Sequence, residues 1–189
     1  MVWMLSSHGK VTPEAIKEFN GQSPRTTAIV GAAIVEDCLA RLIADRLPVD
    51  GDTKKGLFKD GAPLGNLDAK TKVAYVLGIV SKAAFQNLTK IVEIRNKFAH
   101  RLEIADFNHP DVKPLCEELK LIEKHIFPSG TPDSSTPQGI GVKIYIEKLD
   151  EYVATPRGRY FLSIMLFHSL DAYVRHPENP KPVPPRALM

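Results

Sequence analysis

The sequence has few cysteines and no long hydrophobic run, and both absences limit what kind of protein it can be. Only two cysteines, Cys38 and Cys116, occur in 189 residues. Both are therefore expected to be buried thiols in a reducing compartment, not members of a disulfide framework. The longest apolar runs, residues 28–35 and 161–167, are far shorter than the ~20 residues that cross a bilayer. With no export signal visible, we expect a cytoplasmic protein without a membrane segment.

The sequence also lacks the common motifs for metals, cofactors and nucleophilic catalysis. None of its six histidines stands at metal-binding spacing to another histidine or to a cysteine pair, so no metal is expected. The loop at residues 61–65 has no Gly-Lys-Ser/Thr, and no Gly-x-Ser-x-Gly occurs. We predict no cofactor.

No helix-turn-helix pattern is evident. The turn at residues 78–81 does join two helical patterns, but Phe85, Leu88 and Ile91 in the second pattern indicate a buried helix. We therefore expect no sequence-specific reading of DNA.

What is present is helical periodicity with clear start signals. Ser23 and Pro24 combine an N-cap with a proline at the first helical position. The pattern predicts an all-α, single-domain helical bundle of about five to seven helices. The expected helices cover about residues 23–47, 66 or 68 to 77, 81–100, 110–126 and 155–175, with a short helical turn near 57–58.

Three segments make up the chain. Residues 1–22 form an N-terminal segment, 23–176 the helical domain, and 177–189 a Pro-rich tail that is expected to be extended. Residues 142–153 are ambiguous. Alternation up to Ile146 favours a strand, whereas the spacing of Ile146, Leu149 and Tyr152 favours a helix. Helix is the preferred interpretation.

Excess apolar surface predicts a homodimer. The helix expected at residues 24–47 is apolar nearly all round, and residues 161–167 add more apolar surface than one helix face buries internally.

Charge is unevenly distributed along the middle of the chain. Residues 69–101 contain seven Lys or Arg and one acid, whereas residues 103–127 contain six acids and three Lys. This pattern is typical either of two solvated helix faces or of a surface that attracts phosphate. The candidate phosphate-binding residues, and the basis for an RNA partner, are Lys70, Lys72, Lys90, Lys97 and Arg101.

One group of polar residues stands out near the end of the helix expected at 81–100. On a helical wheel Arg95 falls within an apolar arc, so its guanidinium needs an acid, carbonyl groups or a bound phosphate. Glu36 or Asp37 is predicted as its structural partner. Asn96 and His100 are four residues apart and can meet. Arg95 and His100, in contrast, are about 140° apart and converge only if the helix frays or a second subunit contributes.

These residue types suit phosphodiester chemistry. Arg95 could hold a phosphate through two parallel hydrogen bonds, and His100 could transfer a proton near neutral pH. A purely structural interpretation is equally simple: the arginine sits in a salt bridge, and the histidine lies at a helix C-terminus, where a cation is favourable.

Two resemblances bear on this choice. Arg95, Asn96 and His100 follow the order arginine, polar residue, three residues, histidine, which resembles the signature of the HEPN superfamily. That resemblance implies a metal-independent endoribonuclease in which two subunits share a cleft. His100 would be the acid or base, Arg95 would hold the phosphate and Asn96 would assist.

The longer pattern is similar to the mannitol operon repressor family. It covers residues 61–70, 74–81 and 94–100, with further similarity at 31–37 and 155–161. This resemblance implies a regulator that acts without catalysis, through RNA or a protein partner.

Overall fold

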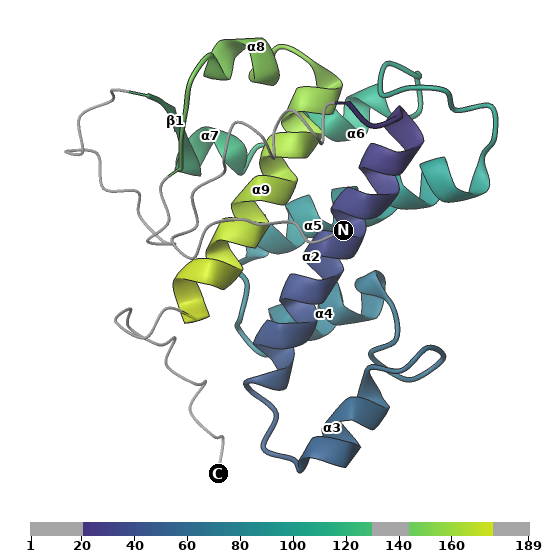
Figure 1. Cartoon of the computed structure of the whole chain (residues 1–189), viewed down its shortest axis with the longest axis vertical. Coiled ribbons are helices and arrows are strands. Elements are labelled where there is room, and N and C mark those ends of the chain that lie inside the picture. The colour runs from purple at the N-terminus through teal and green to yellow at the C-terminus, as the bar shows by residue number, and fades with distance from the viewer. Residues whose placement is uncertain (1–20, 130–143, 176–189) are drawn as a thin grey trace.

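The structure is a computed structural model that describes residues 21–129 and 144–175, and its regular elements are nearly all helical (Figure 1). The helices are α2 (Pro24–Ala44), α3 (Gly51–Leu57), α4 (Leu67–Val76), α5 (Lys82–His100), α6 (Lys113–Glu117), α7 (Ile122–His125), α8 (Leu149–Val153) and α9 (Pro156–Arg175). Two short strands, β1 (Ile126–Pro128) and β2 (Ile144–Ile146), pair in parallel. The predicted all-α bundle is confirmed.

Helices α2 and α9 lie side by side in the bundle (Figure 1). Helices α4 and α5 pack against α2, while α6, α7 and α8 pack against α9. A row of buried rings joins the two groups: Phe98 lies 4.8 Å from Phe107, which lies 5.3 Å from Tyr160, measured between ring centroids. The Tyr160 hydroxyl donates a hydrogen bond to the carbonyl of Ala28 at 2.7 Å, so α9 is tied to α2 within the core.

The helix starts follow the predicted caps. The side-chain oxygens of Ser23, Asn66 and Ser81 accept hydrogen bonds from the backbone N–H three residues further on, at 3.1, 2.9 and 3.3 Å. Each cap satisfies one of the N–H groups that a helix leaves unpaired at its start. Of the two caps considered for α4, Asn66 is the one used.

The single helix predicted over residues 110–126 is wrong: this region forms α6 and α7 with a break between them. Other helices take the backbone groups at the break. Arg159 donates to the carbonyls of Cys116 and Leu119 at 3.3 and 3.2 Å, and the N–H of Leu121 donates to Asn87 at 3.2 Å. Tertiary hydrogen bonds thus replace the helical ones.

Residues 142–153 were predicted as one helix, and that is also wrong. Residues 144–146 form β2, in which Ile144 and Ile146 are buried while Tyr145 is exposed. Lys148 then adopts a left-handed conformation (φ 56°), and α8 begins after it. The strand pattern in the sequence corresponds to β2, and the helix pattern that follows corresponds to α8. The N-terminal segment and the Pro-rich tail lie outside the described residues, apart from positions 21 and 22.

The apolar run of α9 is buried within one chain. Phe161, Leu162, Ile164 and Phe167 are at most 3% exposed. One apolar surface that motivated the predicted homodimer is therefore already covered, and the homodimer stays a prediction.

Both cysteines are buried and free, as expected. Burial raises the pKa of each thiol to about 12, so neither resembles an activated nucleophile. Within the described residues, no helix is long and apolar enough to cross a membrane.

The first turn of α9 fits tightly against α8. Thr155 Oγ1 caps the turn by accepting from the N–H of Gly158 at 3.0 Å. A Cβ at Gly158 would lie only 2.1 Å from the carbonyl oxygen of Tyr152. Only glycine allows this approach.

The two arginines beside that glycine hold other parts of the bundle. Arg157 donates to the carbonyl of Gln22 at 2.7 Å and to Thr27 Oγ1 at 2.9 Å, before and within α2. Arg159 is 8% exposed and adds an ion pair with Glu123 at 2.7 Å to its two carbonyl contacts. The Glu123 pKa is lowered by this arginine.

We predict that Gly158→Ala destabilises the protein by about 2 kcal/mol or more, because the backbone of α8 or α9 must move to admit a methyl group. Denaturant unfolding measures the change. Gly56→Ala is the matched control: its Cβ meets nothing within 4 Å, so stability should be unchanged or slightly higher. Equal effects at the two glycines would contradict the close approach.

Candidate functional site

The candidate site lies at the C-terminal end of α5. This helix forms because Ser81 caps its first turn and apolar residues recur along one face. Ile91 and Phe98 are fully buried. The face that remains in water carries Asn96 and His100, both exposed, in the last two turns.

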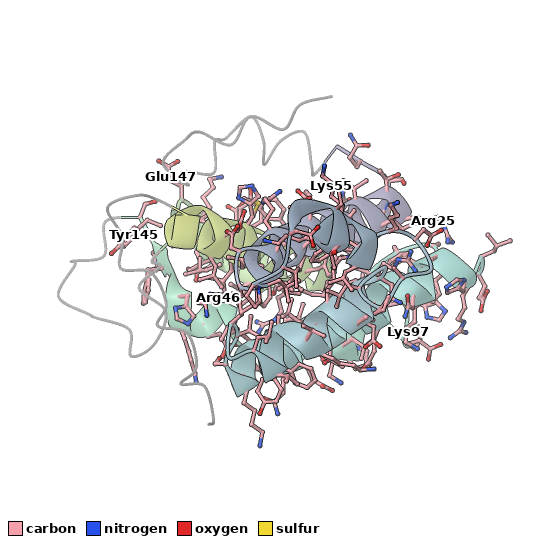
Figure 2. All side chains as sticks on the ribbon, turned by 90° about the horizontal axis from the view of Figure 1, so that it is seen from below. Arg25, Arg46, Lys55, Lys97, Tyr145 and Glu147 are labelled. Atoms are coloured by element: carbon pink, nitrogen blue, oxygen red, sulfur yellow. The ribbon has the colours of Figure 1, made fainter. Side chains whose placement is uncertain are left out.

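The end of α5 is fixed by an arginine that the sequence analysis did not identify. Arg25, in the first turn of α2, donates at 3.1, 3.4 and 3.2 Å to the carbonyls of Arg101, Leu102 and Ile104. A cation there also complements the negative end of the helix dipole. Figure 2 shows Arg25 and Lys97 at the same end of the molecule. No sequence signal could reveal this contact, because its two sides are distant in the chain.

Arg95 is half-buried, and its guanidinium faces a neighbour on its own helix. Nη1 donates a hydrogen bond to Oδ1 of Asn96 at 3.0 Å. Across the described ranges, 21–129 and 144–175, no acid forms an ion pair with Arg95. The charge of Arg95 also acts on the core: burial raises the pKa of Tyr160, and Arg95 offsets part of that increase.

The predicted partners of Arg95 are occupied by other cations. Glu36 accepts from Nζ of Lys70 at 2.6 Å, and the Lys70 side chain is only 5% exposed. Asp37 pairs with Arg41 one turn along α2. The assignment of Glu36 or Asp37 to Arg95 is therefore wrong, because α4 brings Lys70 to Glu36 and a local pair occupies Asp37.

His100 ends α5 with an exposed side chain. It lies one turn after Asn96 on the same side of the helix. In the part of the chain that the structure describes, it has no hydrogen-bond or ion-pair partner. Arg95 and His100 remain about 140° apart around the helix, so one chain does not bring them together. We call Arg95, Asn96, Lys97 and His100 the α5 end surface.

Most of the cations predicted to bind phosphate are neutralised. The pairs are Lys70 with Glu36, Lys72 with Asp68, Lys90 with Glu118, and Arg101 with both Glu103 and Asp111. Lys70 is buried and cannot reach a partner, so its assignment to phosphate is wrong. Among the five, Lys97 alone forms no ion pair within 4 Å in the described residues.

The border of the α5 end surface is charged but balanced. Arg101 hydrogen-bonds to Asp111 and lowers the pKa of that carboxyl, and Lys97 and His109 lower it further. The surface itself offers a guanidinium, an amide, an ammonium and an imidazole to solvent. These groups can bind a phosphate or a carboxylate.

The other segments that carry the family resemblance stabilise the fold. Leu64 is buried, and a Cβ at Gly65 would lie 2.6 Å from the carbonyl oxygen of Lys59. Asn66 caps α4. Residues 155–160 fix the first turn of α9 against α8 and α2. The α5 end surface differs, because the fold makes little use of its exposed side chains.

The fold and this surface define a mostly helical protein with an exposed polar helix end. In the described residues, no group of three or more His, Cys, Asp or Glu could hold a metal ion. The mannitol repressor family matches residues 52–155, which is more than half of the chain, and the protein belongs to that family. It is thus a repressor-like regulatory protein. No curated protein matches the chain.

We predict a large loss of stability when Lys70 is replaced and a small one when Arg95 is replaced, because Lys70 holds the buried ion pair that was predicted for Arg95. Lys70→Ala should destabilise the protein by about 2–4 kcal/mol, because it leaves the partly buried Glu36 carboxylate unpaired. Arg95→Ala should cost less than about 1 kcal/mol, as for other partly exposed side chains outside a network. Denaturant unfolding of both variants tests this. If Arg95→Ala proves the more damaging, Arg95 has a structural role after all.

Proposed function

We propose that the protein is a regulator of the mannitol-repressor type that acts by binding RNA or a protein partner through the α5 end surface. One observation carries this proposal: Asn96 and His100 are exposed, and within the described residues Arg95 hydrogen-bonds to Asn96 alone. Turning these side chains toward a ligand should cost little free energy, because few contacts within the fold have to break.

The arrangement of α4 and α5 supports a mode of action other than reading DNA sequence. A recognition helix must present one face to the major groove. In α5, which follows the turn after α4, Leu88 and Ile91 are completely buried. Its exposed face also carries Glu93, which would approach the phosphate backbone. Both features argue against a DNA-reading helix.

A second candidate function is a metal-independent endoribonuclease of the HEPN type. In such a reaction the RNA 2′-oxygen attacks the adjacent phosphorus, the bond to the 5′-oxygen breaks, and a 2′,3′-cyclic phosphate forms. His100 would remove the proton from the 2′-hydroxyl or supply one to the leaving oxygen, and Arg95 would hold the phosphate. The exposed imidazole of His100, which has no partner in residues 21–129 and 144–175, is the observation that favours this candidate.

Catalysis would require a homodimer. Because Arg95 and His100 point apart on one helix, a shared cleft needs a second copy of α5. Leu102, just beyond the helix end, is 87% exposed, and an apolar side chain at this place suits a protein interface.

The test is RNA binding and RNA cleavage by the same purified proteins, in the presence of a chelator. We expect wild-type protein to bind an RNA pool more weakly as salt rises, and Arg95→Ala to bind it more weakly than wild type. If the protein cleaves, His100→Ala should lower the rate by a factor of ~10²–10⁴ and leave the melting temperature unchanged. Asn108→Ala, an exposed neighbour outside the α5 end surface, is the control.

Two results would redirect the proposal. If wild type and His100→Ala are equally inert in cleavage, the ribonuclease candidate is rejected and the binding role remains. If RNA binding is absent or is unaffected by Arg95→Ala, RNA is rejected as the ligand of this surface. A protein partner is then the remaining form of the proposal.

A further inference from the structure

A groove with a volume of about 560 Å³ lies between α5 and the segment that leads from α6 into α7. Helix α5 contributes Ala83, Asn87 and Lys90, and the opposite wall includes Leu121 and Lys124. Grooves of this size are typical of small-molecule sites. The α5 end surface begins more than one helical turn beyond Lys90, so the proposed function does not use this groove.

A buried amide fixes the distance between the two walls. Asn87 is 6% exposed. Its Oδ1 accepts from the N–H of Leu121 at 3.2 Å, and its Nδ2 donates to the carbonyl of Ala83 at 3.0 Å. Leaving these buried groups unpaired would be costly. The groove is therefore expected to be already formed before any ligand binds.

Lysines outnumber acids among the residues that line the groove. Lys90, Lys120 and Lys124 line it together with one acid, Glu118, and Glu93 lies 3.8 Å from Lys90 at its border. Lys124 has no acidic partner among the residues that the structure describes. Lys120 lies 3.7 Å from Glu123, but the same carboxylate oxygen already accepts from an arginine at 2.7 Å. At least two ammonium groups are thus available to an anion.

Glu118 occupies the place at Lys90 that a ligand oxygen could take. Nζ of Lys90 lies 2.9 Å from Oε2 of Glu118, whose side chain is 57% exposed. The hydrogen bond raises the pKa of Lys90, so the ammonium is charged at neutral pH. Because exposed ion pairs contribute little to stability, this carboxylate can turn into solvent at small cost.

We propose that this groove binds a small phosphomonoester. A phosphate group carries a charge of about −1.5 to −2 at pH 7, opposite in sign to the lysines that line the groove. Lysine ammonium groups bind phosphate as point charges and need no fixed fork geometry. Ala83 and Leu121 offer a small apolar area to the organic part of the molecule.

Removing a lysine and removing the acid should change the affinity for phosphate in opposite directions. Isothermal titration with glycerol 3-phosphate, at constant ionic strength, should show binding to the wild-type protein. The double variant Lys120→Gln/Lys124→Gln should bind about ten-fold more weakly, and Glu118→Gln about three-fold more tightly, as expected for exposed charge pairs. Lys59→Gln, which removes an exposed lysine outside the groove, should bind like wild type.

Glycerol and inorganic phosphate complete the experiment. Glycerol should not bind, because it lacks the charge. Binding of inorganic phosphate as tight as that of glycerol 3-phosphate would assign the groove to free phosphate and reject the ester. No binding of glycerol 3-phosphate, or equal binding by wild type and the double variant, would reject the site.

RNA is the other phosphate source that the same titration separates. If a short RNA binds in a manner that needs Lys120 and Lys124, while glycerol 3-phosphate does not bind, the small-molecule proposal is wrong. Unchanged melting temperatures in the variants show that the fold is intact. These outcomes are independent of Arg95 and His100, so the groove and the α5 end surface can fail separately.

Discussion

The bundle depends on the close packing of the first turn of α9 against α8. At Gly158 the helix comes so near to the carbonyl of Tyr152 that a side chain is excluded. From that position Arg159 reaches the carbonyls at the end of α6, and Tyr160 reaches the backbone of α2. A shift of this turn would therefore break several buried hydrogen bonds at once, and leaving such groups unpaired is expensive.

This packing also explains why α6 and α7 are separate and why a groove opens beside them. Arg159 donates to the carbonyls of Cys116 and Leu119, and this stabilises the turn of the chain after α6. Asn87 then binds the N–H of Leu121 and fixes the turned segment against α5. The lysines of that segment consequently stand across from Lys90 instead of lying along one long helix.

Local signals made much of the fold predictable, whereas long-range contacts did not. The caps at Ser23, Asn66 and Ser81 act within one helical turn, and so do the patterns that define α5. The sequence could not show that Lys70, and not Arg95, pairs with Glu36. A helical wheel shows that a cation is partly buried, but not which helix supplies its acid. Arg25 gave no signal at all for the same reason: the carbonyls that it binds are remote in sequence.

Counting charges along the chain misplaced the basic surface for a related reason. The excess of cations at residues 69–101 is largely cancelled by acids from α2, from the residue that follows α6 and from the loop after α5. Since paired charges attract a third ion only weakly, cations without a described acidic partner matter more than the total. Near α5 they lie in three places: Lys82 at its start, Arg95 and Lys97 at its end, and Lys124 across the groove. A phosphate-bearing partner is therefore expected to contact α5 at its ends, not along its whole length.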